Sequence, residues 1–415
     1  MKFRTICAAA SVALLLAFAA FSQQNPKTAD DKLLEKARAI HERAISIDTH
    51  VDIPGSNYDP GENSPPNRKC TLPKMEKGGL KGVFLVVFVG QQQLSPDAYA
   101  EAYKQAMAKF EAAHNVAEKL YPNRCAIATT PDEVRKIAKT GKRVLMIGIE
   151  NGFVIGTDLS LIRKYYDLGA RYITLSHGGD NQICDSATNT KQLNKGLSPF
   201  GEQVVAEMNR LGIMIDVSHI AEKSFWDVIK VSKAPIIASH SGCSGLNPNP
   251  RNLTDEQLKA LAKNGGVIQI VALGSYLGRE APERAALLAK LLAELGIANR
   301  RQMTPEQRTA YEERVKKEVD PKYPPVSIID FVNHIDHAVK VAGIDHVGVG
   351  TDFDGGGGVP GFNDHSEALN VTVELVKRGY SEKDIDKIWG GNLLRVWREV
   401  QTVATRLSDN GSAQK

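Results

Sequence analysis

Cysteine is scarce in this chain, and clustered cysteines are absent. Of the five cysteines in 415 residues, Cys7 lies in the N-terminal segment. The other four are far apart and form no Cys-x-x-Cys pair: Cys70, Cys125, Cys184 and Cys243. This spacing disfavours a structural zinc site built from thiolates. One or two disulfides remain open, because spacing alone gives no pairing.

The sequence also lacks a dominant sign of charge. It has 52 basic and 48 acidic side chains, a formal net charge of +4. This balance gives no support for a nucleic-acid or membrane-surface partner, and we predict neither. Linkers rich in Ser, Gly and Pro are missing too, as are internal repeats. Their absence favours one large domain over several.

Long apolar runs are missing except at the N-terminus. There Lys2 and Arg4 precede an apolar segment from Ile6 to Phe21 that ends in small residues. This pattern predicts a secretory signal peptide over residues 1–22, and removing it would lower the net charge to about +2. A membrane anchor is the alternative, although the run is slightly short for spanning a bilayer. We therefore expect residues 23–415 to be secreted or periplasmic, without stable membrane insertion after cleavage.

What the chain does contain is a regular alternation of short apolar segments with helical segments and loops. Eight segments are predicted as strands: residues 44–48, 82–89, 143–149, 171–176, 213–218, 235–239, 266–272 and 346–350. Such alternation predicts a parallel sheet, and eight units predict closure into a (β/α)8 TIM-type barrel. Residues 274–325 are charged and rich in Ala, Leu and Arg, so we expect a helical insertion within this single domain.

Residues 211–251 contain the most informative pattern. Two β-branched runs each end in a Ser-His pair, at His219 and His240, and the segment between them has helical spacing. A helix of about ten residues returns the chain far enough to begin a parallel neighbour. The two imidazoles are therefore predicted to lie side by side at the carboxyl ends of adjacent strands, where barrels place their chemistry.

Other strand ends carry similar residue types. His50 and Asp52 are two residues apart, so in extended backbone they share one face. Glu150 ends the third predicted strand, His177 follows the fourth, and Asp352 follows the eighth. Together with the two Ser-His pairs, these positions predict one pocket.

The ligand types in this pocket predict a metal centre. Imidazole and carboxylate without thiolate favour zinc, with Mn, Co or Fe open. Three histidines and two carboxylates exceed the needs of one four-coordinate ion and suit two ions about 3.5–4 Å apart, sharing a carboxylate. Glu150 arises between the two groups and is the natural bridge. His334 and His337, three residues apart in a predicted helix, are expected to be surface or packing residues.

The motifs at these positions resemble those of the membrane (renal) dipeptidase family of metallopeptidases, in its bacterial secreted form. The resemblance extends over most of the chain and rests on these segments: IDTHVD, GIENG, LSHGGDN, DVSH, ASHSGC, NPRNLTDEQL, GVGTDFDG and GGNLLRV. It implies an amidohydrolase-like barrel and a dipeptidase that takes dipeptides with a free C-terminal carboxylate. It also implies two zinc ions per chain, a homodimer and tolerance of D-residues at the C-terminal position.

The resemblance also implies the role of each site residue. His50 and Asp52 would hold one ion and His219 and His240 the other, with Glu150 between them. His177 would bind the scissile carbonyl oxygen. Arg251, which lies in the loop after His240, would receive the substrate carboxylate. Asp352 would carry the proton in an attack by hydroxide held at the two zinc ions.

Two other functions are compatible with the same residues. A binuclear metal hydrolase could act on a cyclic amide, a lactone or a phosphoester. Alternatively, the chain could be a secreted metal- or peptide-binding protein that has kept the fold. Asp352 argues against the second, because a binding site has no need of a proton carrier.

Overall fold

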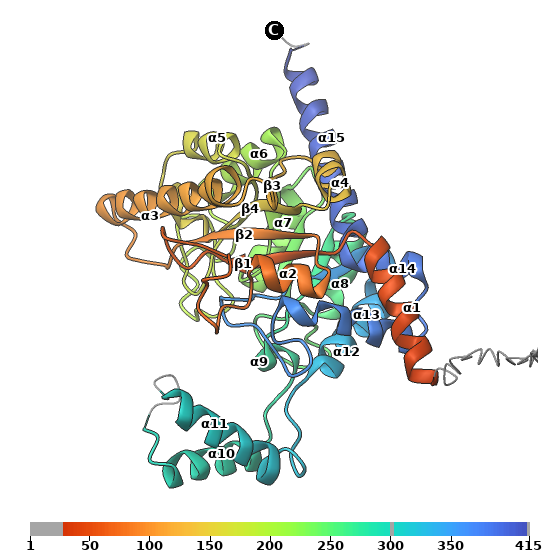
Figure 1. Cartoon of the computed structure of the whole chain (residues 1–415). Coiled ribbons are helices and arrows are strands. Elements are labelled where there is room, and N and C mark those ends of the chain that lie inside the picture. Colours follow the sequence, from red (N-terminus) through yellow and green to blue (C-terminus); the bar gives the residue numbers. More distant parts are fainter. Residues whose placement is uncertain (1–27, 299–302, 413–415) are drawn as a thin grey trace, which may run out of the picture.

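A parallel sheet forms the centre of the computed structural model, which describes residues 28–298 and 303–412 (Figure 1). Its strands are β1 Ile47–Asp52, β2 Gly82–Phe88, β3 Cys125–Ile127, β4 Arg143–Glu150, β5 Ala170–Thr174, β6 Met214–Asp216, β7 Ile237–Ser241, β8 Val267–Ile270 and β9 Val347–Val349. The pairing order is β1-β2-β4-β5-β6-β7-β8-β9, and β3 pairs outside this path with β4. Every pairing within the sheet is parallel.

The sheet closes just beyond the end of β9. The backbone N–H of Asp352 donates to the carbonyl of His50 at 3.1 Å, and that of Asp52 donates to the carbonyl of Phe353 at 3.1 Å. These bonds join the last strand segment to the first. The eight-stranded (β/α)8 architecture predicted from the sequence is therefore confirmed.

The helices connect successive strands and cover the sheet (Figure 1). They are α1 Ala29–Arg43, α2 Leu72–Gly78, α3 Pro96–Asn115, α4 Pro131–Lys139, α5 Ser160–Asp167, α6 Pro199–Leu211, α7 Glu222–Val231, α8 Asp255–Lys263, α9 Gly274–Leu277, α10 Pro282–Glu294, α11 Pro305–Arg314, α12 Ile328–Ala342, α13 Ala368–Lys377, α14 Glu382–Asp386 and α15 Asn392–Ser412. Local sequence sets many of their boundaries. Thr254, for example, caps α8 in a capping box with Gln257, and Ser198 caps α6 by accepting the backbone N–H of Gly201.

Two apolar clusters stabilise the barrel. The larger one lies between the strands and the surrounding helices. The smaller one includes the first residues of several strands, such as Ile47, Ile237 and Val267, together with Leu393 and Trp397 of α15. Helix α15 therefore packs across the amino-terminal ends of the strands and forms the floor of the barrel. The opposite, carboxyl end of the strands is left for the site.

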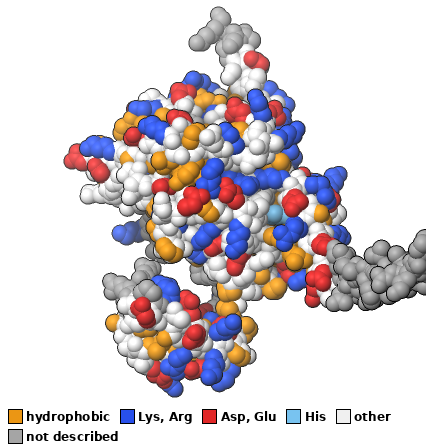
Figure 2. All heavy atoms as spheres, viewed as in Figure 1, with side chains coloured by type: hydrophobic (Ala, Val, Ile, Leu, Met, Phe, Trp, Pro, Cys, Tyr) orange, Lys and Arg blue, Asp and Glu red, His pale blue; other side chains and the backbone are white. Residues whose placement is uncertain are grey.

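Helices α10 and α11 form a separate hairpin with its own small core. Leu291, Tyr311 and Val319 are buried in that core. At the base of the hairpin, Arg284 pairs with Asp320 at 2.7 Å. Figure 2 shows the hairpin as a lobe set off from the main body, with both signs of charge interspersed on the visible face. The predicted insertion is thus helical, and it extends away from the barrel.

Two details differ from the sequence predictions. The first strand spans Ile47–Asp52 and not residues 44–48, so His50 and Asp52 lie within it. Strand β3 was not predicted.

The four cysteines from Cys70 to Cys243 are buried and free. The predicted signal peptide lies outside the described residues, and none of the helices within them is long and apolar enough to cross a membrane.

Candidate metal centre and active site

The side chains of His50, Asp52 and Glu150 meet at the carboxyl ends of β1 and β4. His50 Nε2 lies 3.7 Å from Asp52 Oδ1 and 3.4 Å from Glu150 Oε2. The alternation of β1 puts His50 and Asp52 on the same face, as their spacing predicts. One oxygen of Glu150 therefore faces the first predicted ligand pair.

The other oxygen of Glu150 faces the second pair. Glu150 Oε1 lies 2.9 Å from His219 Nε2 and 3.3 Å from His240 Nε2. The two Nε2 atoms are themselves 2.8 Å apart. Three atoms that can each offer a lone pair thus converge on one point, and Glu150 lies between the two groups of ligands.

The residues present fit a pair of zinc ions. His50 Nε2 and Asp52 Oδ1 are buried and have no hydrogen-bond partner. A buried polar atom without a partner carries a desolvation cost, and a cation between these two atoms would remove it. Within the described residues, the two candidate ligand groups are His50, Glu150 and His240, and Glu150, His177 and His219. This set of imidazole and carboxylate donors is the one zinc accepts.

The pKa values in this pocket show more buried negative charge than the histidines neutralise. Burial alone would lower the pKa of His50, but the carboxylates of Glu150 and Asp52 outweigh it and raise that pKa to about 9. Burial and Glu150 raise the pKa of Asp52 to about 7. Burial would also raise the pKa of Glu150, but its histidine neighbours hold it well below the ordinary value. Added cations would relieve this imbalance.

His177 lies at the open side of the cluster. It follows β5 by three residues, and its Nε2 is 3.8 Å from Glu150 Oε1. Its side chain is 31% exposed, whereas that of Glu150 is 4% exposed. Its ring packs between those of Phe88, at a centroid distance of 4.6 Å, and His219, at 4.2 Å. Burial lowers the pKa of His177. The charge of Glu150 opposes this shift, and that of Arg251 adds to it. An incoming molecule can therefore reach the His177 imidazole, and the lowered pKa favours its neutral form.

Asp352 is held beside Asp52 by an unusual backbone conformation. Its φ is 60°, and its carbonyl accepts the backbone N–H groups of the three glycines Gly355 to Gly357. A Cβ on Gly355 would lie 2.3 Å from Asp352 Oδ1 and 2.8 Å from Asp52 Oδ2, so only glycine fits there. Burial, with the charges of Asp52 and Glu150, holds the pKa of Asp352 well above its ordinary range although His50 opposes the shift.

Arg251 reaches the cluster from the loop after β7. Only 3% exposed, it donates from Nη2 to the carbonyl of His240 at 3.2 Å, and its Nε has no partner. The ring of Tyr276 lies 5.3 Å from its guanidinium carbon. Tyr276 is in α9, and Asn252 donates to its carbonyl at 2.8 Å, which ties this loop to the base of the insertion. The sequence analysis did not single out Tyr276.

His334 and His337 lie outside the pocket, as predicted. The backbone N–H of Cys243 donates to His334 Nδ1 at 2.9 Å, and His334 Nε2 contacts the carbonyl of Leu277 at 3.0 Å. His337 Nε2 lies 2.7 Å from Asp255 Oδ1. Both histidines therefore tie α12 to its neighbours.

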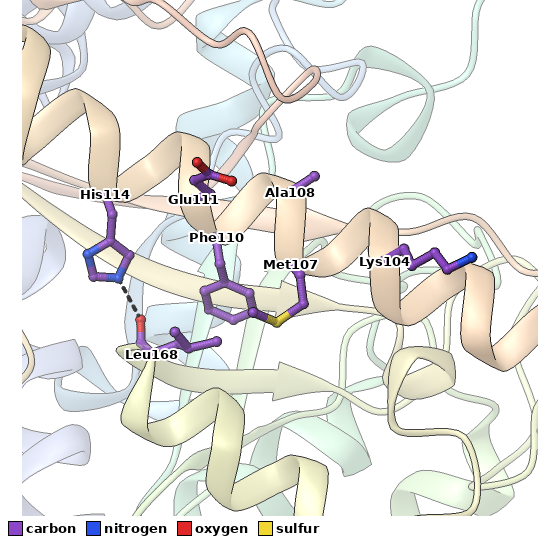
Figure 3. Close-up of a pocket in the computed structure, with 7 residues that line it drawn as sticks. All are labelled: Lys104, Met107, Ala108, Phe110, Glu111, His114 and Leu168. Carbon is purple, nitrogen blue, oxygen red and sulfur yellow. Dashed lines mark hydrogen bonds between the residues drawn. The ribbon is translucent and has the colours of Figure 1, made fainter.

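A groove on the outer side of α3 contains none of the predicted site residues (Figure 3). Its volume is about 590 Å³, and apolar side chains such as Met107, Phe110 and Leu168 supply much of its lining. His114 Nε2 contacts the carbonyl of Leu168 at 3.0 Å across it. It has no metal-ligand cluster and plays no part in the chemistry considered below.

Comparison with known proteins agrees with the barrel fold and with a polar site at the carboxyl ends of its strands. The family model of membrane dipeptidase (peptidase family M19) matches residues 34–411. Dipeptidase tcpJ from Claviceps purpurea is 32% identical over 338 residues, which cover 80% of this chain and 69% of that protein. Dipeptidase verJ from Clonostachys rogersoniana is 30% identical over 347 residues, which cover 82% and 78%.

Solved structures show the same fold. The crystal structure of the probable dipeptidase PvdM from Pseudomonas aeruginosa matches with a TM-score of 0.77 and 32% identity, covering 90% of this chain and 99% of that one. A metallopeptidase from Rhodobacter sphaeroides, liganded with a phosphinate mimic of the dipeptide L-Ala-D-Ala, matches with a TM-score of 0.64 and 24% identity, covering 89% and 96%.

Fold and site thus define a metal-dependent hydrolase. The chain belongs to the membrane dipeptidase family and is a dipeptidase of that metallopeptidase family. The family resemblance predicted from the sequence is confirmed.

Proposed function

We propose that this dipeptidase uses a dinuclear zinc centre to hydrolyse dipeptides that have a free C-terminal carboxylate. The observation that carries the proposal is the position of Glu150. Its two oxygens face two separate sets of ligand atoms, so one carboxylate can serve two ions. His50 and Asp52 would hold one ion, and His219 and His240 the other.

When bound, the two zinc ions would lower the pKa of a water molecule and polarise the amide carbonyl. The remaining steps belong to side chains of this chain. His177, a neutral imidazole at the open side, would donate an N–H to the oxygen of the scissile carbonyl as negative charge develops there. This role is supported by its exposure and by its 3.8 Å distance to Glu150.

Asp352 would move the proton. It takes a proton from the attacking water and gives it to the amide nitrogen as the C–N bond breaks, because an amine leaves poorly unless it is protonated. A carboxylate suits this task, since it can accept a proton from water and release it in the next step. The backbone bonds from three glycines fix it in place for both transfers.

Arg251 would receive the substrate carboxylate. Its guanidinium is buried next to the His240 end of the cluster, and its Nε is unpartnered, so a carboxylate could bind in a bidentate manner. A buried cation next to the His240 end of the cluster would place the substrate C-terminus close to the proposed metal pair. This position would favour cleavage next to a free C-terminus over cleavage within a longer chain.

The test is zinc analysis of the purified protein, with turnover of a dipeptide panel before and after chelation. We expect about two zinc equivalents per chain and loss of activity on chelation, restored by zinc.

The requirement for a free C-terminal carboxylate is tested with C-terminally amidated dipeptides and with the Arg251→Met variant, and both changes should raise KM strongly. One equivalent at saturation, or equal turnover of amidated substrates, would overturn the proposal; cleavage of lactones or phosphoesters alone would favour the other hydrolase class.

We also propose that residues 1–22 are a signal peptide and that the mature chain, one domain over residues 23–415, is secreted or periplasmic. The proposal rests on the charged and apolar pattern of the first residues. We further propose that the mature protein is a homodimer without membrane insertion. N-terminal sequencing of exported protein and light scattering of the mature form test these points. An uncleaved N-terminus or a monomer at micromolar concentration would contradict them.

A further inference from the structure

Two of the candidate zinc ligands are held from behind by side chains that lie deeper in the barrel. His50 and His240 both turn Nε2 toward Glu150, so Nδ1 of each ring points back toward the strands. Tyr172 Oη lies 3.0 Å from His50 Nδ1, and Ser239 Oγ lies 2.9 Å from His240 Nδ1. These contacts decide which ring nitrogen carries the proton.

The hydrogen of Tyr172 is already used. Its hydroxyl donates to the carbonyl of Thr49 at 3.0 Å, and a phenol has only one hydrogen to give. Tyr172 Oη can therefore only accept from His50 Nδ1, which must be an N–H. The neutral ring then carries its lone pair on Nε2, the atom that faces Glu150 and Asp52.

The same count of available hydrogens applies to the hydroxyl that contacts His240. Ser239 Oγ donates to Asp216 Oδ2 at 2.6 Å, and a hydroxyl has only one hydrogen to give. Ser239 Oγ therefore accepts the Nδ1–H of His240. Asp216 in turn is held by the backbone N–H groups of Ser218 at 3.0 Å and Ser239 at 2.8 Å. A buried carboxylate thus fixes His240 through one intervening hydroxyl.

The position of Tyr172 depends on the floor of the barrel. Its ring is fully buried and packs at 5.1 Å from the ring of Phe84, which lies 5.8 Å from that of Trp397 in α15. Gly148 of β4 leaves the space for it, since a Cβ there would lie 2.2 Å from Tyr172 Cζ. The hydroxyl therefore has little freedom to move away from His50.

We propose that Tyr172, and Asp216 acting through Ser239, are positioning residues that fix the Nδ1–H tautomers and the orientation of His50 and His240, and thereby set the affinity for zinc. The inference rests on the proposed dinuclear centre. Partners behind metal-ligating histidines typically change metal affinity by about 10- to 100-fold when removed.

The test is the Tyr172→Phe variant, which removes one oxygen and keeps the ring that packs in the floor. Zinc affinity is measured by competition with a chromophoric chelator, with no substrate present. We expect one of the two zinc equivalents to bind about 10- to 100-fold more weakly. The matched control is Tyr165→Phe, since Tyr165 is equally buried and donates only to the carbonyl of Val154 at 2.8 Å, away from the site.

A second pair of variants tests the hydroxyl behind His240, which lies 2.9 Å from His240 Nδ1 and also 3.4 Å from His50 Nδ1. Ser239→Ala should weaken zinc binding in the same assay, whereas Ser224→Ala, which removes a buried hydroxyl bonded to the carbonyl of Asp185, should not. Thermal unfolding of all four variants confirms that each is folded. Wild-type zinc affinity in both Tyr172→Phe and Ser239→Ala would overturn the inference and leave the proposed function intact. A wild-type protein that binds no zinc would overturn the proposed function itself.

Discussion

Individual carboxylates in the pocket have different tasks because their surroundings differ. Glu150 is held ionised by histidines, whereas Asp352 lies among other acids and holds its proton more firmly. Replacing Asp352 with Asn keeps the shape and removes the proton transfer. We expect kcat to fall by about 10²- to 10⁴-fold with both zinc ions retained. Steady-state kinetics with metal analysis checks this, and a variant with full activity would remove Asp352 from the mechanism.

A similar separation of roles applies to His177. If this residue stabilises charge on the substrate oxygen, His177→Ala should lower kcat by about 10²- to 10³-fold. Zinc content should remain at two equivalents, because the other ligand atoms are unchanged. Loss of zinc together with activity would instead make His177 a metal ligand. His114→Ala, which removes a histidine on the outer face of α3, is the control.

The sequence indicated the candidate ligands but not the residues behind them. His219 and His240 could be predicted because each follows an apolar run and ends in the same Ser-His pair. Tyr172 lies inside β5 and Asp216 ends β6, and the sequence analysis singled out neither of them. Their role depends on which neighbour they contact across the barrel, and that is set by strand register.

At the scale of elements, most strands were predictable because buried parallel strands are continuous apolar runs. Strand β3 was missed because it has only three residues, Cys125–Ile127, too few for a pattern. The first strand was predicted to begin at residue 44, before its actual start, because Ala44 and Ile45 are apolar as well. The structure begins it at Ile47, after Ser46 has accepted the backbone N–H groups of Lys81 and Gly82.

Helix α1 is fixed to the barrel by a histidine that must stay neutral. His41 Nδ1 lies 2.7 Å from Thr372 Oγ1, and its Nε2 lies 3.0 Å from the carbonyl of Gly78. Trp389 donates to Thr372 at 2.8 Å, so Thr372 can donate onward to Nδ1. Burial, opposed by the bond to Gly78, lowers the pKa of His41 to about 4.

This shift predicts a loss of stability in acid. The unfolded chain protonates His41 near pH 6.5 and the folded chain only near pH 4, so stability falls as the pH drops through that window. At pH 4.5 the loss from this residue is about 2 kcal/mol. Urea unfolding of zinc-free protein at pH 7 and pH 4.5 should show a smaller decrease for His41→Gln than for wild type. An equal decrease in both would exclude His41 as a cause.

The hairpin of α10 and α11 should be dispensable for the barrel. Its apolar cluster is separate from the two clusters of the main body, and its base is closed by Arg284 and Asp320 within the hairpin itself. We expect a chain in which a short Gly-Ser linker replaces residues 282–322 to unfold within a few degrees of wild type and to bind two zinc ions. Calorimetry and metal analysis test this. Loss of cooperative unfolding would show that the hairpin is part of the folding unit.

For the molecule as a whole, the clustered acidic side chains of the site should destabilise the folded protein when no metal is bound, and bound zinc should offset this effect. Glu150 is buried with Asp52 and Asp352 half-buried in the same pocket, and the charge of Glu150 raises the pKa of both. A ligand at about 1,000 times its Kd stabilises the folded state by about 4 kcal/mol. We therefore expect chelation to lower the unfolding temperature by several degrees and added zinc to restore it. An unchanged transition would mean that the cluster binds no cation.

Because α15 forms the floor, the last helix of the chain is also the one on which the deepest part of the barrel depends. A ribosome finishes β1 to β9 before it has made Leu393 and Trp397, and until then Phe84 and Tyr172 have no cover from below. A product that stops short of residue 392 would therefore contain every proposed metal ligand and still lack the support under His50. We therefore expect a nascent chain to bind metal only after its C-terminal helix has been made.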